Sequence, residues 1–285
     1  MPYADVNDIK IYYEIHGSEE STPIVLIEGW GMSLWCWFRQ LKTLSEKHKV
    51  IIFDNRGAGK SSKPDYAYSA EMLADDAKKL LDFLGIEKAH IFGNSMGGMI
   101  AQQFAISYPE KVLGLILAST SFGEANPNII QRTNKTLAAM FAMPTETISQ
   151  EQAMDIKRNV SYSQNFLINN KTLSKQIEKW ILENPQPIYA LVQQSQVAPN
   201  FDSEEKIGKV TLPTLILHGD DDLIIPPENA ELLLNKIPNS RLILFKEGPH
   251  RVEIERHNDY NEAILNFIDE VDKGRYKPEP KKVII

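Results

Sequence analysis

The chain has 285 residues, of which 42% are hydrophobic and 24% are charged, and its formal net charge is -7. This composition is typical of globular proteins and excludes a disordered or fibrous one. The acidic balance, with no stripe of Lys and Arg, argues against a nucleic-acid partner. The single cysteine, Cys36, excludes an internal disulfide and favours a reducing compartment. Residues 1–17 show no signal-peptide pattern and no apolar run reaches the length of a membrane span, so we expect a cytoplasmic protein without a membrane partner.

Strand and helix patterns alternate along most of the chain. Residues 3–6 and 9–15 are rich in β-formers around Asn7-Asp8 and predict an opening hairpin. Continuous apolar runs predict strands buried on both faces of a parallel sheet; they occupy residues 23–27, 50–53, 89–92, 112–118, 214–217 and 242–245. Helical patterns lie between most of them, at residues 38–47, 70–84, 96–107, 227–236 and 259–271. This alternation predicts an α/β fold with a mostly parallel central sheet flanked by helices.

The alternation is interrupted between residues 121 and 208, where helical patterns follow one another without a strand. We therefore expect a core of residues 1–120 and 209–272, with residues 121–208 inserted as a helical lid over the carboxyl edge of the sheet. Residues 273–285 are expected to form a poorly ordered tail. Prolines interrupt the lid at Pro144, Pro185, Pro187 and Pro199. Large lid side chains could line a pocket, although packing within the lid is expected for most of them: Met140, Phe141, Met143, Tyr162, Phe166, Trp180 and Tyr189.

The sequence Gly-Asn-Ser-Met-Gly at residues 93–97 joins the predicted strand 89–92 to the predicted helix 96–107. A strand, a sharp turn and a helix in this order are typical of a nucleophile elbow, in which small residues allow a tight bend that holds the serine hydroxyl outward. Ser95 is therefore the candidate nucleophile. The alternative interpretation is a glycine-rich turn with an ordinary serine.

An activated serine needs a base, and the base needs an orienting carboxylate. The predicted strand 214–217 opens into an acidic turn with three competing aspartates at residues 220–222, and the loop after strand 242–245 ends in His250. Because the carboxyl ends of parallel strands lie at one edge of the sheet, the serine, the acid and the histidine can meet there. Their order along the chain is the order expected with an elbow serine.

With these motifs the chain resembles the α/β-hydrolase superfamily over nearly its whole length except the insertion. Asp54-Asn-Arg-Gly-Ala-Gly-Lys-Ser61 is similar to the family's D-x-R-G-x-G-x-S loop, and Tyr108-Pro-Glu-Lys-Val112 follows the elbow helix. His250 is followed five residues later by Glu255, as in the family. The resemblance is closest to small carboxylesterases and to lactonases similar to 3-oxoadipate enol-lactonase. It implies a serine esterase or lactonase that acts on a small-molecule substrate and needs no metal or organic cofactor.

The resemblance also implies roles for further residues. The family places its acid four residues before a proline, which selects Asp222 and leaves Asp220 and Asp221 as turn residues. The backbone N–H groups of Met96 and Trp30 are the implied oxyanion hole. This chain departs from the family at Glu28, where most relatives have histidine. We expect this carboxylate to turn away and accept backbone hydrogen bonds, rather than to be held protonated by burial.

Other functions are also compatible with parts of the sequence. A carbon-carbon bond hydrolase of vinylogous diketones would share the elbow, but such relatives usually have an aromatic residue where Arg251 follows the histidine. A weakly catalytic ligand-binding sensor of the same fold would also fit Glu28. Residues 56–61 resemble the end of a phosphate-binding loop, but Asp54 stands where that loop requires glycine. The five other histidines show no metal-ligand spacing and are expected to be packing or surface residues. The oligomeric state is not predicted.

Overall fold

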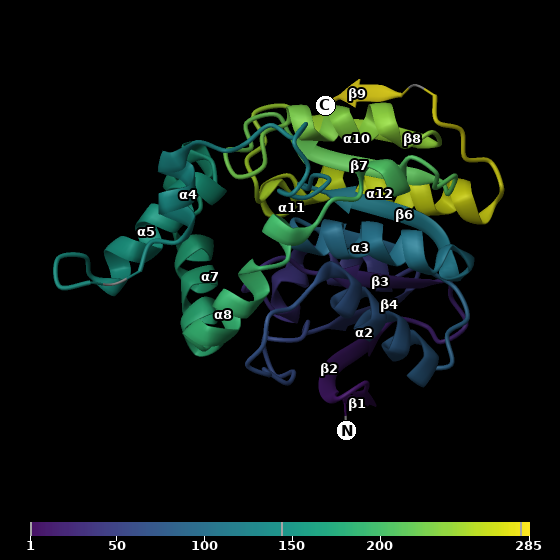
Figure 1. Cartoon of the computed structure of the whole chain (residues 1–285). Coiled ribbons are helices and arrows are strands. Elements are labelled where there is room, and N and C mark those ends of the chain that lie inside the picture. Colours follow the sequence, from purple (N-terminus) through teal and green to yellow (C-terminus); the bar gives the residue numbers. More distant parts are fainter. Residues whose placement is uncertain (1, 144, 280) are drawn as a thin grey trace.

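The computed structural model describes residues 2–143, 145–279 and 281–285, so the predicted interruption at Pro144 lies outside the described residues. In these ranges a nine-stranded sheet runs in the order β1-β2-β4-β3-β5-β6-β7-β8-β9 (Figure 1). The first two strands form the predicted hairpin, the second also pairs antiparallel with β4, and the remaining neighbours pair in parallel. The strands are β1 Tyr3–Val6, β2 Ile9–His16, β3 Pro23–Ile27, β4 Lys49–Phe53, β5 Ala89–Asn94, β6 Val112–Ala118, β7 Thr214–Gly219, β8 Ser240–Phe245 and β9 Lys282–Ile284.

One face of the sheet is covered by α2 Ala70–Phe83, α3 Met96–Ser107 and α10 Glu228–Lys236. These helices follow the apolar patterns in the sequence to within about one residue at each end. The hydroxyl of Ser69 accepts a hydrogen bond from the Met72 backbone N–H and so caps the first turn of α2. Burial of apolar side chains between these helices and the sheet is the main force that holds this layer in place.

The other face is covered by the 3₁₀ helix η1 Leu34–Arg39, by α1 Leu41–Ser45 and by α12 His257–Asp272. Alternate side chains of β3 enter the two layers: Val25 belongs to the first and Ile24 to the second. This is the period of two expected of a strand buried on both sides. The fold predicted from the alternation of strands and helices is therefore confirmed.

Residues 121–143 and 145–208 contain helices and no strand. In Figure 1 the helices α4, α5, α7 and α8 lie to one side of the sheet and its two helical layers. A small apolar cluster joins this segment to the core, because Phe166 and Ile177 pack with Ile254 of the short helix α11 Val252–Glu255. The helices of this segment are α4 Asn134–Met140, α5 Gln150–Ser161, α6 Gln164–Asn169, α7 Lys171–Glu183, α8 Ile188–Ser195 and α9 Glu204–Ile207, with a short 3₁₀ helix at η3 Ala198–Asn200. Another short 3₁₀ helix, η2 Pro109–Lys111, lies in the core between α3 and β6.

The C-terminal segment differs from the poorly ordered tail expected from the sequence. Lys282–Ile284 form β9, which pairs in parallel with β8, and the Ile285 backbone N–H donates to Leu244 O at 2.9 Å. The edge of β8 offers unpaired backbone groups to any extended chain that can reach it. A short Val-Ile-Ile ending is enough to occupy that edge, although composition alone indicated a charged, proline-containing tail.

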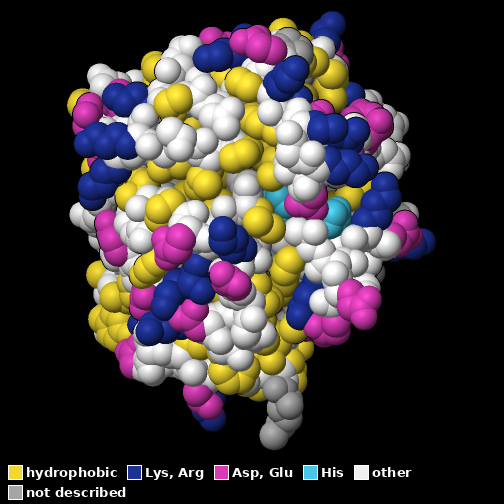
Figure 2. Space-filling model, turned by 90° about the vertical axis from the view of Figure 1, so that its right-hand side faces the viewer, with side chains coloured by type: hydrophobic (Ala, Val, Ile, Leu, Met, Phe, Trp, Pro, Cys, Tyr) yellow, Lys and Arg dark blue, Asp and Glu magenta, His cyan; other side chains and the backbone are white. Residues whose placement is uncertain are grey.

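None of the helices in the described ranges is long and apolar enough to cross a membrane. On the face shown in Figure 2, Lys and Arg side chains stand beside Asp and Glu side chains rather than gathering into one basic area. A face on which the two signs alternate has no strong field of a single sign.

Candidate active site

Ser95 lies at the sharp turn between β5 and α3, with backbone angles φ 56 and ψ -122. A positive φ is unfavourable for a residue with a side chain and persists only where the surroundings enforce it. The two flanking glycines show how tight this turn is. A Cβ atom at Gly93 would lie 2.1 Å from Gly97 O, and one at Gly97 would lie 2.1 Å from Ile27 O. Only glycine fits at both positions, so the packing of α3 against β3 and β5 enforces the conformation of Ser95.

His250 and Asp222 come from two other strands and meet Ser95 at the carboxyl edge of the sheet. His250 Nε2 lies 3.2 Å from Ser95 Oγ, and His250 Nδ1 lies 2.8 Å from Asp222 Oδ2. Asp222 follows β7 and His250 follows β8, as the sequence predicts. The histidine and the aspartate are buried, whereas Ser95 is partly exposed. The structure therefore brings the three predicted side chains into one hydrogen-bonded chain that ends at an accessible hydroxyl.

Burial opposes ionisation of Asp222, but the neighbouring imidazoles of His250 and His218 overcome it and hold the pKa of this carboxyl well below its usual range. Its Oδ1 also accepts the backbone N–H groups of Ile224 and Ile225 at 2.8 and 2.9 Å. An ionised Asp222 can only accept hydrogen bonds. His250 Nδ1 must therefore carry the proton toward it, which leaves Nε2 free to accept the proton of Ser95.

Of the three aspartates in the turn, Asp220 and Asp221 are exposed and Asp222 is buried. Their backbone N–H groups donate to Phe245 O and Gly248 O, which ties the turn after β7 to the end of β8. The choice of Asp222 among three adjacent acids thus agrees with the positions of the side chains.

The contact of His218 with the aspartate was not predicted from the sequence, which indicated a packing or surface residue. His218 is buried on β7, its Nε2 lies 2.9 Å from Ile225 O, and the same nitrogen lies 3.3 Å from Asp222 Oδ2. A second imidazole therefore lies beside the carboxylate oxygen that His250 contacts. The position of His218, four residues before Asp222 at the end of an apolar strand, is the signal that would have found it.

The two residues implied as oxyanion donors flank Ser95. Met96 is the first residue of α3, where backbone N–H groups have no partner within the helix and the helix dipole favours negative charge. Trp30 lies in the loop after β3, and a Cβ atom at the adjacent Gly29 would lie 3.0 Å from the Cβ atom of Ser95. The structure thus brings the loop and the elbow into contact, so both backbone segments border the serine hydroxyl.

Glu28, the departure from the family pattern, is buried and accepts its neighbour's backbone hydrogen bond as expected. Its Oε2 accepts the Gly29 N–H at 2.5 Å, and its Oε1 lies 3.3 Å from Arg251 Nη2. Arg251 also lies 2.7 Å from Glu253 Oε1, so one guanidinium faces two buried carboxylates. Burial raises the pKa of Glu253 to about 7 because Arg251 compensates it only in part. No local pattern predicted that Glu28 and Arg251, 223 positions apart, would pair.

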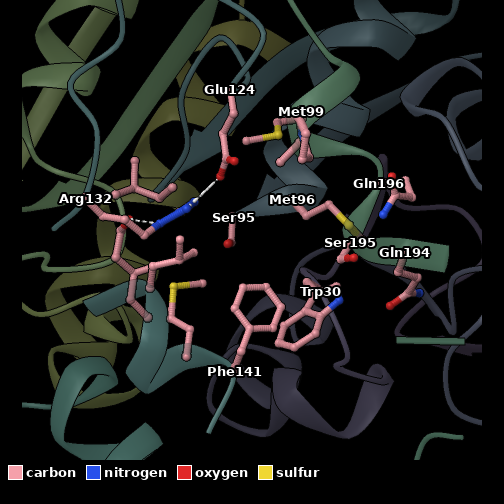
Figure 3. Close-up of a pocket in the computed structure, with 16 residues that line it drawn as sticks. Trp30, Ser95, Met96, Met99, Glu124, Arg132, Phe141, Gln194, Ser195 and Gln196 are labelled. Carbon is pink, nitrogen blue, oxygen red and sulfur yellow. Dashed lines mark hydrogen bonds and ion pairs between the residues drawn. The ribbon is translucent and has the colours of Figure 1, made fainter. Parts of the chain in front are cut away.

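Ser95 opens into a cavity of about 300 Å³ lined mostly by apolar side chains. In Figure 3 its hydroxyl points into a space bordered by Trp30, Phe141 and Met96, with Glu124 and Arg132 on another side. The Trp30 and Phe141 ring centroids are 4.9 Å apart, and the Trp30 indole N–H donates to Leu191 O of α8 at 2.8 Å. The helical segment thus supplies a wall of the space around the serine.

Of the seven large side chains that the sequence singled out in this segment, some line cavities and others pack against the core. Met140 and Phe141 line the Ser95 cavity, while Phe166 and Trp180 belong to the apolar cluster between this segment and the core. Tyr189 is exposed and its hydroxyl donates to Lys63 O at 3.1 Å. Met143 and Tyr162 line a second cavity, and Tyr162 also packs against this cluster, where its ring stacks on Phe166. Three of the seven residues therefore contribute to packing, whereas the sequence predicted packing for most of them.

The loop at residues 54–61 is held in place by hydrogen bonds and an ion pair with neighbouring parts of the protein. Asp54 accepts the backbone N–H groups of Leu34 and Lys60 at 2.8 and 2.7 Å, and Arg56 forms a buried ion pair with Asp76 at 2.7 Å. The buried side chains of Asp54 and Arg56 therefore link β4 to η1 and α2.

The sequence profile described as "alpha/beta hydrolase fold" matches residues 22–256, and the chain belongs to this family. RutD of Azorhizobium caulinodans, which is named as a carbamate hydrolase, is 27% identical over 273 residues that cover 96% of this chain and 100% of RutD. The enol-lactonase from Burkholderia xenovorans LB400 shares the fold with a TM-score of 0.81 and 24% identity, over 94% of this chain and 100% of that one. The meta-cleavage product hydrolase from Pseudomonas fluorescens IP01 is 26% identical, with a TM-score of 0.76 over 92% and 95% of the two chains. The family and these relatives together indicate that the chain is a hydrolase.

Proposed function

We propose that this protein is a serine hydrolase that cleaves a small carboxylic ester or lactone through an acyl-enzyme. The observation that carries the proposal is the hydrogen-bonded chain from Ser95 Oγ through His250 to the ionised Asp222, with the serine opening into an apolar cavity. A nucleophile, a base and an orienting carboxylate in this geometry are the parts that acyl transfer requires.

In the proposed mechanism Ser95 Oγ attacks the substrate carbonyl carbon while His250 Nε2 takes the hydroxyl proton. Asp222 fixes the tautomer of His250 and stabilises the imidazolium. The backbone N–H groups of Met96 and Trp30 stabilise the oxyanion, a contribution of about 3 kcal/mol for each donor. When the carbon-oxygen bond breaks, the leaving alcohol receives the proton from His250. Water then attacks the acyl-enzyme, His250 takes a proton from it, and the carboxylate product leaves as Ser95 regains its proton.

Glu28 bears on this proposal because a carboxylate facing the oxyanion would oppose catalysis. Its two oxygens are engaged by the Gly29 N–H and by Arg251. Arg251 therefore offsets the charge of Glu28 within the protein interior, where an unpaired charge would be costly. The pairing favours an active esterase over a sensor that barely turns over.

The helical segment of residues 121–208 is proposed to act as the lid that selects the acyl and alcohol groups. Its residues Leu137, Met140 and Phe141 line the cavity at Ser95, and Trp30 from the core completes that wall. An apolar wall with few polar groups discriminates between substrates by size and shape.

The direct test is turnover of p-nitrophenyl acetate and labelling by a fluorophosphonate probe. The Ser95→Ala variant should lose labelling and on the order of 10⁴-fold or more in kcat, because nucleophile and base act as a unit. Ser107→Ala, at the exposed end of the same helix, serves as the matched control and should keep both. Unchanged turnover in Ser95→Ala would sink the mechanism. A screen of esters, lactones and carbamates would then identify the substrate class.

A carbon-carbon bond hydrolase is the second candidate, because the meta-cleavage product hydrolase is 26% identical over 92% of this chain. Arg251, which follows the histidine, is buried and held by Glu28 and Glu253 rather than directed into the Ser95 cavity. Conversion of a vinylogous diketone with a kcat/KM above that of every ester and lactone tested would favour this candidate.

A further inference from the structure

A second cavity of about 310 Å³ lies next to the cavity that holds Ser95. Helices α5 and α7 form one side of it, and the loop after β3, from Trp30 to Trp35, forms another. Trp30 lines both cavities, so the second cavity borders the one at the serine. The volume lies at the small end of the range for small-molecule sites.

The second cavity is lined mainly by apolar side chains from both regions of the protein. Met154 of α5, Ile177 and Ile181 of α7 and Leu191 of α8 face Trp35 of the core. Side chains of this kind offer dispersion contacts and a dry surface to an apolar ligand body. They provide no partner for a charge.

Three cationic side chains also line this cavity, and two of them are neutralised. Arg158 pairs with Asp155 and, at 2.9 Å, with Glu178. Arg251 faces Glu28 and Glu253. Lys157 differs, because among the residues that the structure describes no carboxylate lies within ion-pair distance of its ammonium.

Lys157 is half-buried on α5, and burial lowers the pKa of its ammonium. An ammonium withdrawn from water without a counter-ion is unfavourable, and a lysine on an exposed helix face would avoid that position by extending into solvent. An anion bound in the cavity would supply the missing counter-ion in surroundings of low dielectric, where the attraction is stronger than in water.

We propose that this second cavity is a binding site for a small apolar molecule that carries a single negative charge, with Lys157 as its counter-ion. The single uncompensated cation matches one negative charge, and the apolar walls match an aliphatic or aromatic body. The volume has room for about ten water-sized groups, which corresponds to a carboxylate with a chain of medium length. The bound molecule would contact Trp30, which lines this cavity.

The proposal is independent of the reaction at Ser95, because it concerns binding alone. Octanoate, which has a single charge and about the right size, is a suitable probe, and octanamide is its neutral isostere. Isothermal titration calorimetry on the full chain should show one octanoate site, with octanamide bound at least tenfold more weakly. Lys157→Met should weaken octanoate binding at least tenfold, and Lys157→Arg should restore most of it.

Lys179→Met is the matched control, since Lys179 lies on α7, is 63% exposed and does not line the cavity. It removes the same charge and should leave octanoate affinity within twofold of the wild type. Equal affinities for octanoate and octanamide would overturn the proposal without the need for any variant. Unchanged octanoate affinity in Lys157→Met would overturn it as well, because the anion would then bind elsewhere, for example in the Ser95 cavity.

Discussion

The carboxyl edge of the sheet and the helical segment of residues 121–208 hold their functional side chains in different ways. At the sheet edge Asp222 and His250 are 3% and 6% exposed, and hydrogen bonds hold them to backbone and to one another. In the helical segment Leu137 and Phe141, which line the Ser95 cavity, are 40% and 44% exposed. A side chain that is packed closely on all sides is held in a single conformation, whereas a half-exposed side chain can change its conformation. The comparison indicates that the strands place the reacting groups and the helices shape the space around them.

The two regions also differ in whether their buried charges have a counter-ion within the protein. At the sheet edge Glu28 and Arg251 face each other, and Asp222 lies between two imidazoles. In the helical segment Lys157 lines a cavity without a partner among the described residues. A charge that has its counter-ion within the protein stabilises the protein's own geometry, whereas a charge without one is available to a ligand.

The largest expected effect comes from Asp222→Asn, which tests the sheet edge. An amide cannot hold His250 in the tautomer that accepts the Ser95 proton, so kcat for p-nitrophenyl acetate should fall by about 10⁴-fold with little change in KM. Asp221→Asn, one residue earlier and exposed, is the control and should stay within twofold of the wild type. Equal losses in both variants would mean that the turn as a whole, rather than the carboxylate at residue 222, supports activity.

A smaller effect is expected from Glu253→Gln, measured as the free energy of unfolding against pH. The pKa of Glu253 is about 7 in the folded protein against an ordinary value of 4.5. Between these values the unfolded chain has released the proton and the folded protein retains it, so this group lowers stability as pH rises from about 4.5 to about 7. Removing the group should flatten the pH dependence by about 3 kcal/mol across that window.

Urea denaturation at several pH values provides this measurement. Glu262→Gln, exposed on α12, controls for the loss of one carboxylate and should keep the wild-type pH dependence. If Glu253→Gln also keeps the wild-type pH dependence, then Arg251 holds the Glu253 carboxylate ionised across the whole pH range. The buried charges at the sheet edge would then be fully compensated.

The smallest effect is expected in the helical segment, from Leu137→Ala. This change removes part of the apolar wall near Ser95 and leaves the reacting groups untouched. We expect kcat/KM for p-nitrophenyl butyrate to fall roughly tenfold relative to the acetate, the range that a few methylene contacts supply. Ile188→Ala, which is 64% exposed on α8 and outside the cavity, should leave that ratio unchanged. Equal losses on both esters would show that this wall supports the reaction itself.

Most of the core fold could be predicted because its signals are local. Apolar runs of five to seven residues defined β3 and β6 at their observed ends, and the glycines around Ser95 marked the turn that the packing requires. Asp222 could be chosen from its neighbours through the resemblance to a family. Each of these signals lies within about ten residues of the feature it predicts.

The rest of the site depended on contacts that local patterns do not record. β9 closes a sheet edge that the composition of the C-terminal segment did not predict. The partner of Glu28 follows His250 in the chain, and each residue alone appeared to be a departure from a pattern. Only together do they form a neutralising pair.

The sequence by itself determined the alternation of strands and helices, the elbow at Ser95 and the order of Ser95, Asp222 and His250, because periodicity and motif are properties of neighbouring residues. Tertiary structure alone decided that Arg251 pairs with Glu28, that Trp30 lines two cavities and that Lys157 lines one of them without a carboxylate partner among the described residues. These features join residues more than a hundred positions apart. The energies of these contacts depend on how deeply each charge is buried and on how far apart the charges lie. Both quantities are set only when distant segments of the chain pack together in the folded protein.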